Sequence, residues 1–234
     1  MNTARFDWGE ELHQTVVKSL TTSFGLDFLL LEDKHGGDVN TIHNAREGVY
    51  ATDAERQRYE QREGYDSHHY HSHESYIATN RAGKKALEAG TLTDTYTGEK
   101  FAANDKKNLD HIIAAHEIHN DPGRILAECD GADLANDSSN LTFTNESLNK
   151  AKKAKTMDAF VQTLQEQHAV TTQEIARLRS QPTLSEQEQK QLNKLENKAA
   201  ADFERMKEAD KKARVKYNST INQEYYTSSK FAKN

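Results

Sequence analysis

Cysteine and proline are both scarce in this chain of 234 residues. The single cysteine, Cys129, excludes an internal disulfide and any structural zinc site built on cysteine pairs. Beyond Met157 there is no glycine, and Pro182 is the only proline. Because glycine and proline are the residues that most often interrupt helices, the C-terminal third is predicted to form long helices.

Long hydrophobic runs are also missing. The longest, residues 28–31, falls far short of the roughly 20 apolar residues that a membrane-spanning helix needs. The first residues, MNTARFDWGEEL, lack the charged start and apolar run of a secretory signal. The sequence therefore predicts a soluble, cytoplasmic protein.

An excess of basic residues is absent as well, because the formal net charge is −6. This balance argues against a protein that coats nucleic acid with a uniformly basic surface, although it permits a local basic patch. Only 35% of the residues are hydrophobic and 29% are charged. Such a composition supports a modest core and predicts helices with one solvated face.

The pattern of apolar residues predicts an α+β protein with three regions. Residues 1–90 are expected to be mainly helical, with an amphipathic helix over 8–24. Helices are also predicted over 42–63, which is rich in Arg, Glu and Gln, and over 65–87, where Gly90 stops the helix.

The second region, residues 91–156, changes to a strand-like composition. Residues 91–101 suggest a short strand or hairpin around a Thr-Gly pair. Two strands are predicted over 109–114 and 140–144, separated by a polar loop, and a helix is predicted over 145–155.

The third region, residues 157–234, reads as a charged helical hairpin. Its two helices are expected over 158–180 and 184–217, joined near Pro182. An apolar seam with three- and four-residue steps predicts contact with a second copy of the chain or with a protein partner. The seam consists of Leu192, Leu195, Ala199, Phe203 and Met206.

The central region carries Asp110-His111 at the end of its first strand, Asn140 at the start of its second, and Asn149 on the following helix. This pattern resembles the HNH family of nucleases, whose site is a ββα unit that grips one divalent metal ion. Tyr96-Thr97-Gly98 is similar to the turn that precedes the site in the HNH domain of CRISPR effector nucleases. The resemblance covers roughly a quarter of the chain and lacks the flanking Cys-x-x-Cys pairs of some relatives.

The resemblance implies a metal-dependent endonuclease that hydrolyses phosphodiester bonds of DNA, with RNA left open as a substrate. His111 would be the general base, Asp110 and Asn149 the metal ligands, and Asn140 the residue that fixes the tautomer and angle of His111. Adjacent strand residues point to opposite sides, so one can hold metal while the other takes a proton from water. A carboxylate and an amide oxygen favour Mg²⁺ or Mn²⁺ over zinc.

Basic side chains around this motif are candidates for binding the nucleic-acid backbone. Lys152 and Lys155 lie on one predicted helix face with Asn149. The alternative is an ordinary solvated basic turn. The candidates are Lys150, Lys152, Lys153 and Lys155, with Arg124 and Lys107 as further ones.

Two groups of histidines leave alternatives open. His116 and His119, together with Glu117, either add a ligand or an orienting contact to the site or belong to a polar surface loop. His69 and His73 are spaced to share one helix face and could bind zinc, or they could lie on a surface helix.

Two other functional classes compete with the nuclease. One is a non-catalytic nucleic-acid-binding or scaffolding protein that uses the ββα module as a docking platform. Loss of the base or of the metal ligands would indicate it, and here all of them are present. The other is an interaction protein built on the C-terminal hairpin.

Overall fold

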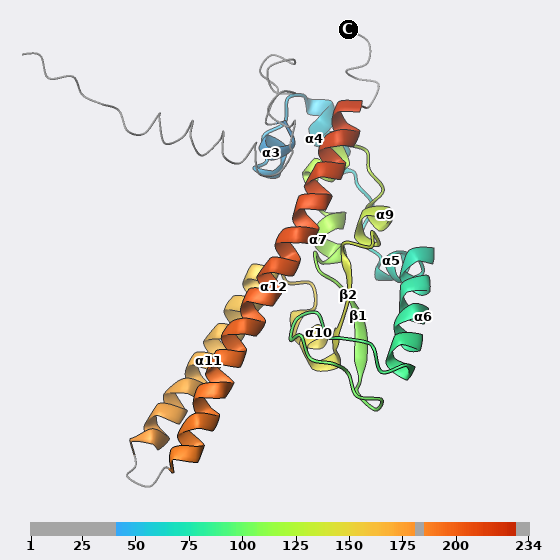
Figure 1. Cartoon of the computed structure of the whole chain (residues 1–234). Coiled ribbons are helices and arrows are strands. Elements are labelled where there is room, and N and C mark those ends of the chain that lie inside the picture. Colours follow the sequence, from blue (N-terminus) through green and yellow to red (C-terminus); the bar gives the residue numbers. More distant parts are fainter. Residues whose placement is uncertain (1–40, 181–184, 228–234) are drawn as a thin grey trace, which may run out of the picture.

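The computed structural model of the chain describes residues 41–180 and 185–227 (Figure 1). It combines helices with one two-stranded sheet, so the α+β class is confirmed. The helix predicted over 8–24 lies outside the described residues. None of the helices within 41–180 and 185–227 combines the length and the apolar character that crossing a membrane requires.

Between residue 41 and the sheet there are four helices, and none of them matches the two long helices predicted there. The region 42–63 is divided because Thr52 starts a new helix with a capping box, in which its side chain and that of Glu55 each bond the other's backbone N–H. The region 65–87 is divided because the His73 side chain accepts a hydrogen bond from the backbone N–H of Ser75. The helices are α3 (Thr41–Arg46), α4 (Asp53–Glu60), α5 (Ser67–His71) and α6 (Glu74–Glu88).

The sheet consists of β1 (Lys107–His111) and β2 (Leu141–Asn145), which pair antiparallel with His111 opposite Leu141. The helix α10 (Glu146–Lys152) follows at once, because the Asn145 side chain accepts from the backbone N–H of Leu148 and caps it. It packs against both strands. The predicted order of strand, strand and helix is therefore present, with bounds shifted by a few residues.

The connection between the strands was expected to be a polar loop, and this expectation is wrong. It forms three short helices, α7 (Ala115–His119), α8 (Pro122–Leu126) and α9 (Gly131–Ala135). Asp121 and Asp130 cap α8 and α9 through their carboxylates, and Pro122 occupies the first position of α8, where its missing N–H is harmless. Ile118 and Leu126 bury their side chains in the core.

The hairpin suggested for residues 91–101 is reduced to a turn with one bridge, between Thr93 and Lys100. The buried Asp94 carboxylate holds this turn by accepting hydrogen bonds from the backbone N–H groups of Tyr96 and Thr97. It also accepts from the Thr144 hydroxyl and from Asn145 at the end of β2. The turn is thus fixed to the sheet.

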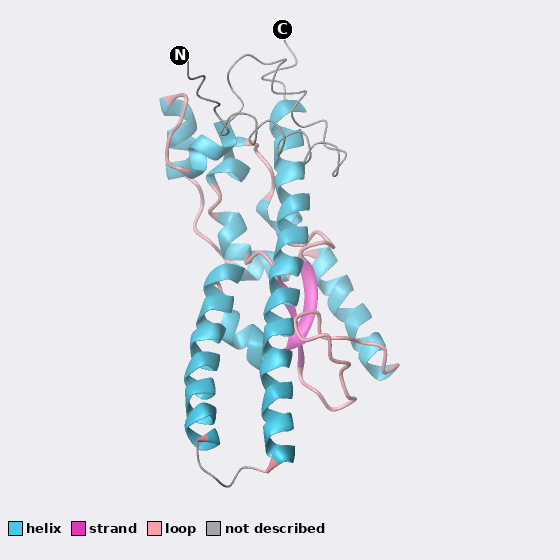
Figure 2. Ribbon diagram, turned by 60° about the vertical axis from the view of Figure 1, so that its left-hand side comes forward, coloured by secondary structure: helices cyan, strands magenta, loops and turns pink. Residues whose placement is uncertain are grey.

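The predicted C-terminal hairpin is confirmed as α11 (Met157–Arg179) and α12 (Glu186–Thr227). With 42 residues, α12 is about 63 Å long. Its first half runs beside α11 and projects from the rest of the molecule, whereas its second half lies along the body (Figures 1 and 2). That second half extends beyond the predicted end because Tyr217, Ile221 and Tyr225, at helical spacing, are buried in the core.

The two strands lie between α12 and α6 (Figures 1 and 2). On the α6 side, Gly83 allows the ring of Phe143 to pack directly on the helix, since an added Cβ would lie 2.0 Å from a ring carbon. On the other side, α12 is fastened to the body by an Arg214–Glu117 ion pair of 2.7 Å and a hydrogen bond of 2.6 Å from the Tyr217 hydroxyl to Asp121.

Candidate active site

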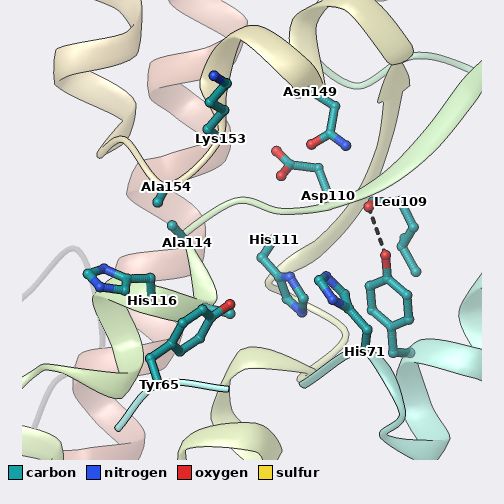
Figure 3. Close-up of a pocket in the computed structure, with 12 residues that line it drawn as sticks. Tyr65, His71, Leu109, Asp110, His111, Ala114, His116, Asn149, Lys153 and Ala154 are labelled. Carbon is teal, nitrogen blue, oxygen red and sulfur yellow. Dashed lines mark hydrogen bonds between the residues drawn. The ribbon is translucent and has the colours of Figure 1, made fainter. Parts of the chain in front are cut away.

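A pocket of about 300 Å³ lies where β1 ends, bordered by α5, α6, α7 and the end of α10 (Figure 3). Three of the four residues that the sequence assigned to chemistry line it, namely Asp110, His111 and Asn149. Asp110 and His111 are the last two residues of β1, and Asn149 comes from α10. The pairing of β1 with β2 and the packing of α10 on both bring these three together.

The Asp110 carboxylate and the Asn149 amide point toward one another at one end of the pocket (Figure 3). Within the described parts of the chain, no three side chains of His, Cys, Asp or Glu are gathered as a metal site would gather them. One carboxylate and one amide oxygen are nevertheless a donor set suited to a hard cation that keeps several waters. This pair is of the kind that could hold Mg²⁺ or Mn²⁺, with Asp110 and Asn149 as the residues that would contact the ion.

Asp110 is buried and held by two neighbours. The Tyr96 hydroxyl donates to its Oδ2 at 2.6 Å, and the Lys152 ammonium group lies 3.3 Å from Oδ1 and 3.2 Å from Oδ2. Burial, with the neighbouring Asp110, raises the pKa of Tyr96 well above its ordinary value, so the phenol stays a proton donor. The carboxylate orientation is thus fixed from two sides.

The expectation that Lys152 contacts nucleic-acid phosphates needs correction. Its side chain is 0% exposed, and its Nζ donates to the backbone carbonyl of His111 at 2.7 Å as well as to Asp110. The ammonium group therefore binds protein atoms beneath the pocket, and a nucleic-acid phosphate at the surface does not reach it. Asn149 and Lys152 are on the same helix, but the Lys152 side chain lies where α10 packs against β1.

The other three lysines lie at the surface. Lys150 pairs with Glu146 at 2.9 Å, and Lys155 donates to the carbonyl of Ala151. Lys153 lines the pocket and ends α10 with a φ of 52°, a conformation that costs a residue with a side chain of the order of 1–3 kcal/mol. Among the three lysines at the surface, Lys153 is thus the one that lines the pocket.

His111 is buried with a defined ring orientation. Its Nε2 lies 3.0 Å from Oδ1 of Asn136. The Asn136 amide nitrogen donates to the carbonyls of Tyr70 and Ala132, so its oxygen must face the ring and Nε2 must carry the proton. The neutral ring therefore keeps its lone pair on Nδ1, the atom that can act as a base.

Electrostatics favour the same neutral form. Burial lowers the pKa of His111 below its ordinary value, and nearby His71 lowers it further, while the hydrogen bond to Asn136 opposes the shift. The ring also stacks on Tyr76, with centroids 5.3 Å apart, and lies 5.6 Å from the ring of His71. Tyr76 is anchored in turn by donating to the carbonyl of Leu109 (Figure 3).

The predicted role of Asn140 is corrected by this geometry. Its side chain accepts from the backbone N–H of Ile113 and donates to the carbonyls of Ile113 and Ala135. It thereby holds the chain just after β1, whereas the ring of His111 is oriented by Asn136. Asn140 lies just before β2, next to the end of β1, so its amide reaches backbone groups there.

The remaining candidates have structural partners. Arg124 donates to three backbone carbonyls, including that of Cys129, and Lys107 lies over the ring of Phe143. His119 joins Tyr70 to the carbonyl of Glu63. These contacts fix loops and strands.

Some of the histidine candidates lie away from the pocket and others line it. His69 and His73 do not share a helix, because α5 ends at His71 and His73 caps α6 while lying 3.0 Å from Asp133. The spacing that suggested zinc is therefore not realised. His116 and His71, in contrast, line the pocket.

Sequence reasoning missed Asn136 and the inward role of Lys152. The contact of Asn136 with His111 joins residues 25 positions apart, and no spacing rule signals it. Tyr96 belonged to a motif that was noticed, and the structure gives that tyrosine a role, since it is fully buried and donates to Asp110.

No family model matches the chain, and no match was found among curated proteins or solved structures.

Proposed function

We propose that the protein is a metal-dependent endonuclease of the HNH type that hydrolyses phosphodiester bonds, with DNA as its substrate. The observation that carries this proposal is the position of His111. Its buried imidazole, with Nε2 3.0 Å from Oδ1 of Asn136, lines the same small pocket as the Asp110 carboxylate and the Asn149 amide.

Each side chain has a defined part in the reaction. Nδ1 of His111 removes a proton from a water molecule, whose oxygen then bonds to phosphorus while the bond from phosphorus to the leaving oxygen breaks. Asn136 holds the ring so that the imidazolium formed in this step keeps its position. Asp110 and Asn149 would hold Mg²⁺ or Mn²⁺, which supplies positive charge beside the scissile phosphate.

Lys152 and Tyr96 act on the reaction indirectly, through their contacts with Asp110. They fix the Asp110 carboxylate, so this ligand needs little reorganisation when a cation binds. Lys153 lines the pocket, and we expect it to contact a phosphate of the bound strand. The choice of DNA rests on the resemblance to the HNH family, and RNA is the first alternative to test.

Cleavage of supercoiled plasmid in Mg²⁺, in Mn²⁺ and in EDTA tests this function, with Asn149→Ala compared against Ser147→Ala. Both residues are on α10, but only Asn149 lines the pocket, and Ser147 is exposed. We expect metal-dependent nicking that is lost in Asn149→Ala and retained in Ser147→Ala. Plasmid binding without cleavage in any metal would instead favour the docking platform.

A further inference from the structure

One end of the pocket is aromatic and takes no part in the proposed hydrolysis. Tyr65 and His116 lie side by side there, with ring centroids 5.1 Å apart. His71 also lines the pocket, but it lies on the other side of His111, beside the ring of Tyr76 (Figure 3). We call Tyr65 and His116 the aromatic end.

The aromatic end lies across the pocket from the atoms that would handle the phosphate. Figure 3 shows Tyr65 and His116 on one side of His111 and the Asp110–Asn149 pair on the other. Three of the other lining residues, Ala114, Ala115 and Ala154, have small side chains that take up little of the space.

This arrangement fits a nucleotide in extended form. A phosphate beside Asp110 and Asn149 places the attached nucleoside along His111, toward Tyr65 and His116. The hydroxyl of Tyr65 points into this space, and no hydrogen bond to it is made within the described residues (Figure 3). A volume of about 300 Å³ is at the lower limit for small-molecule pockets and is suited to a single nucleotide unit.

We propose that the aromatic end receives an unpaired nucleobase next to the cleaved phosphate, so that the substrate is single-stranded or locally unpaired nucleic acid. The inference rests on the proposed function, because that function places the phosphate. Bases within a duplex are stacked and paired, and only an unpaired base presents its face to protein rings. Stacking also supplies affinity that a chain of net charge −6 gains less readily from backbone phosphates.

The test measures binding in EDTA, where hydrolysis is not expected. A fluorescein-labelled single-stranded DNA and the same sequence as a blunt duplex are titrated with the full chain, and dissociation constants are read from anisotropy. The variants are Tyr65→Leu, Tyr65→Phe and His116→Leu. Tyr50→Leu is the matched control, because Tyr50 stacks on Tyr59 and does not line the pocket.

We expect tighter binding to the single strand than to the duplex. Tyr65→Leu and His116→Leu should each weaken single-strand binding by roughly 5- to 100-fold, as loss of base stacking does. Tyr65→Phe, which keeps the ring, and Tyr50→Leu should stay within about twofold of the wild type. Thermal melting verifies each fold, and the exposed His116 carries the test if Tyr65→Leu does not fold.

Equal affinity for duplex and single strand, or an unchanged single-strand affinity in folded Tyr65→Leu and His116→Leu, would overturn the inference. The cleavage assay separates this failure from failure of the proposed function. Metal-dependent cutting with no preference for unpaired strands would refute base binding by the aromatic end but would agree with the proposed nuclease function. Ring-dependent single-strand binding without cutting in any metal would support the aromatic end and refute the nuclease.

Discussion

Lys152 has an ammonium group that is completely withdrawn from solvent. Burying a charge is tolerated only when it is paired and hydrogen-bonded, and Lys152 meets both conditions through Asp110 and the carbonyl of His111. Its two contacts fall on the adjacent residues that are proposed to bind metal and to act as base. One buried side chain therefore sets the position of both.

Lys152→Met should destabilise the fold by about 3–5 kcal/mol, because it leaves the buried Asp110 carboxylate without its cation. Urea unfolding at neutral pH measures the change. Lys150→Met is the control, since its pair with Glu146 is exposed and its loss should cost less than about 1 kcal/mol. A Lys152→Met protein as stable as the wild type would show that the buried pair does not stabilise the fold.

At this scale the sequence predicted part of the site. Asp110, His111 and Asn149 were selected by the resemblance to the HNH family, and the structure brings them to one pocket. Helical spacing also predicted that Lys152 lies near Asn149. It could not predict that the Lys152 side chain is buried where α10 packs against β1. Asn136 could not be assigned to His111, because their contact depends on how α9 packs.

Among the elements, α3, α8 and α12 meet at a single carboxylate. Asp121 caps α8, pairs with Arg46 of α3 at 2.7 Å and accepts the hydroxyl hydrogen bond of Tyr217 on α12. Burial by itself would raise the pKa of Asp121. The hydrogen bond and charge of Arg46, then Tyr217 and the N–H of Gly123, bring that pKa below its usual 3.8.

Asp121→Asn should lower the free energy of unfolding by about 1.5–3 kcal/mol at pH 7, the usual contribution of hydrogen bonds to a charged group. A carboxyl with a lowered folded-state pKa stabilises the fold above its unfolded value and loses this contribution as the pH falls through the folded value. The difference from the wild type should therefore shrink below pH 3.8.

Urea unfolding at a series of pH values measures this dependence, with Asp53→Asn as a control because its pair with Arg56 is largely exposed. A difference between wild type and Asp121→Asn that widens in acid would contradict the assignment.

Whether a segment forms a helix or a strand was easier to predict than where a helix is interrupted. The helical hairpin and both strands of the sheet were expected close to where they occur. The helices over 42–63 and 65–87 were predicted as continuous because their composition is helix-favouring throughout. Single side chains at Thr52 and His73 interrupt them through local capping, which competes with helix continuation.

At the scale of the whole molecule, residues 41–180 and 185–227 form a body with a projecting pair of helices (Figures 1 and 2). The second half of α12 shares one core cluster with residues from α3, α5 and α7, including Ile42, Tyr70 and Ile118. The projecting half has mostly exposed side chains where they are described. We therefore expect the fold to depend on the second half of α12 and not on the projecting half.

Replacing residues 170–200 by a short Gly/Ser linker should preserve the fold, whereas ending the chain at residue 156 should abolish it. The first change leaves Met157, Phe160 and Met206 in the core, and the second removes them together with Tyr217 and Ile221. Circular dichroism melts distinguish the outcomes. A cooperative transition in the protein ending at residue 156 would show that the body folds without α12.

The most direct test of the nuclease assignment is single-turnover cleavage of supercoiled plasmid in Mg²⁺ by the wild type and by His111→Ala. His68→Ala is the matched control, because His68 is exposed on α5 and does not line the pocket. We expect EDTA to abolish nicking by the wild type, His68→Ala to cut at the wild-type rate, and His111→Ala to lose at least about 100-fold, as removal of a general base does. Undiminished cutting by folded His111→Ala would contradict the assignment of His111 as the base, and absence of cutting by the wild type in every divalent metal would contradict the nuclease itself.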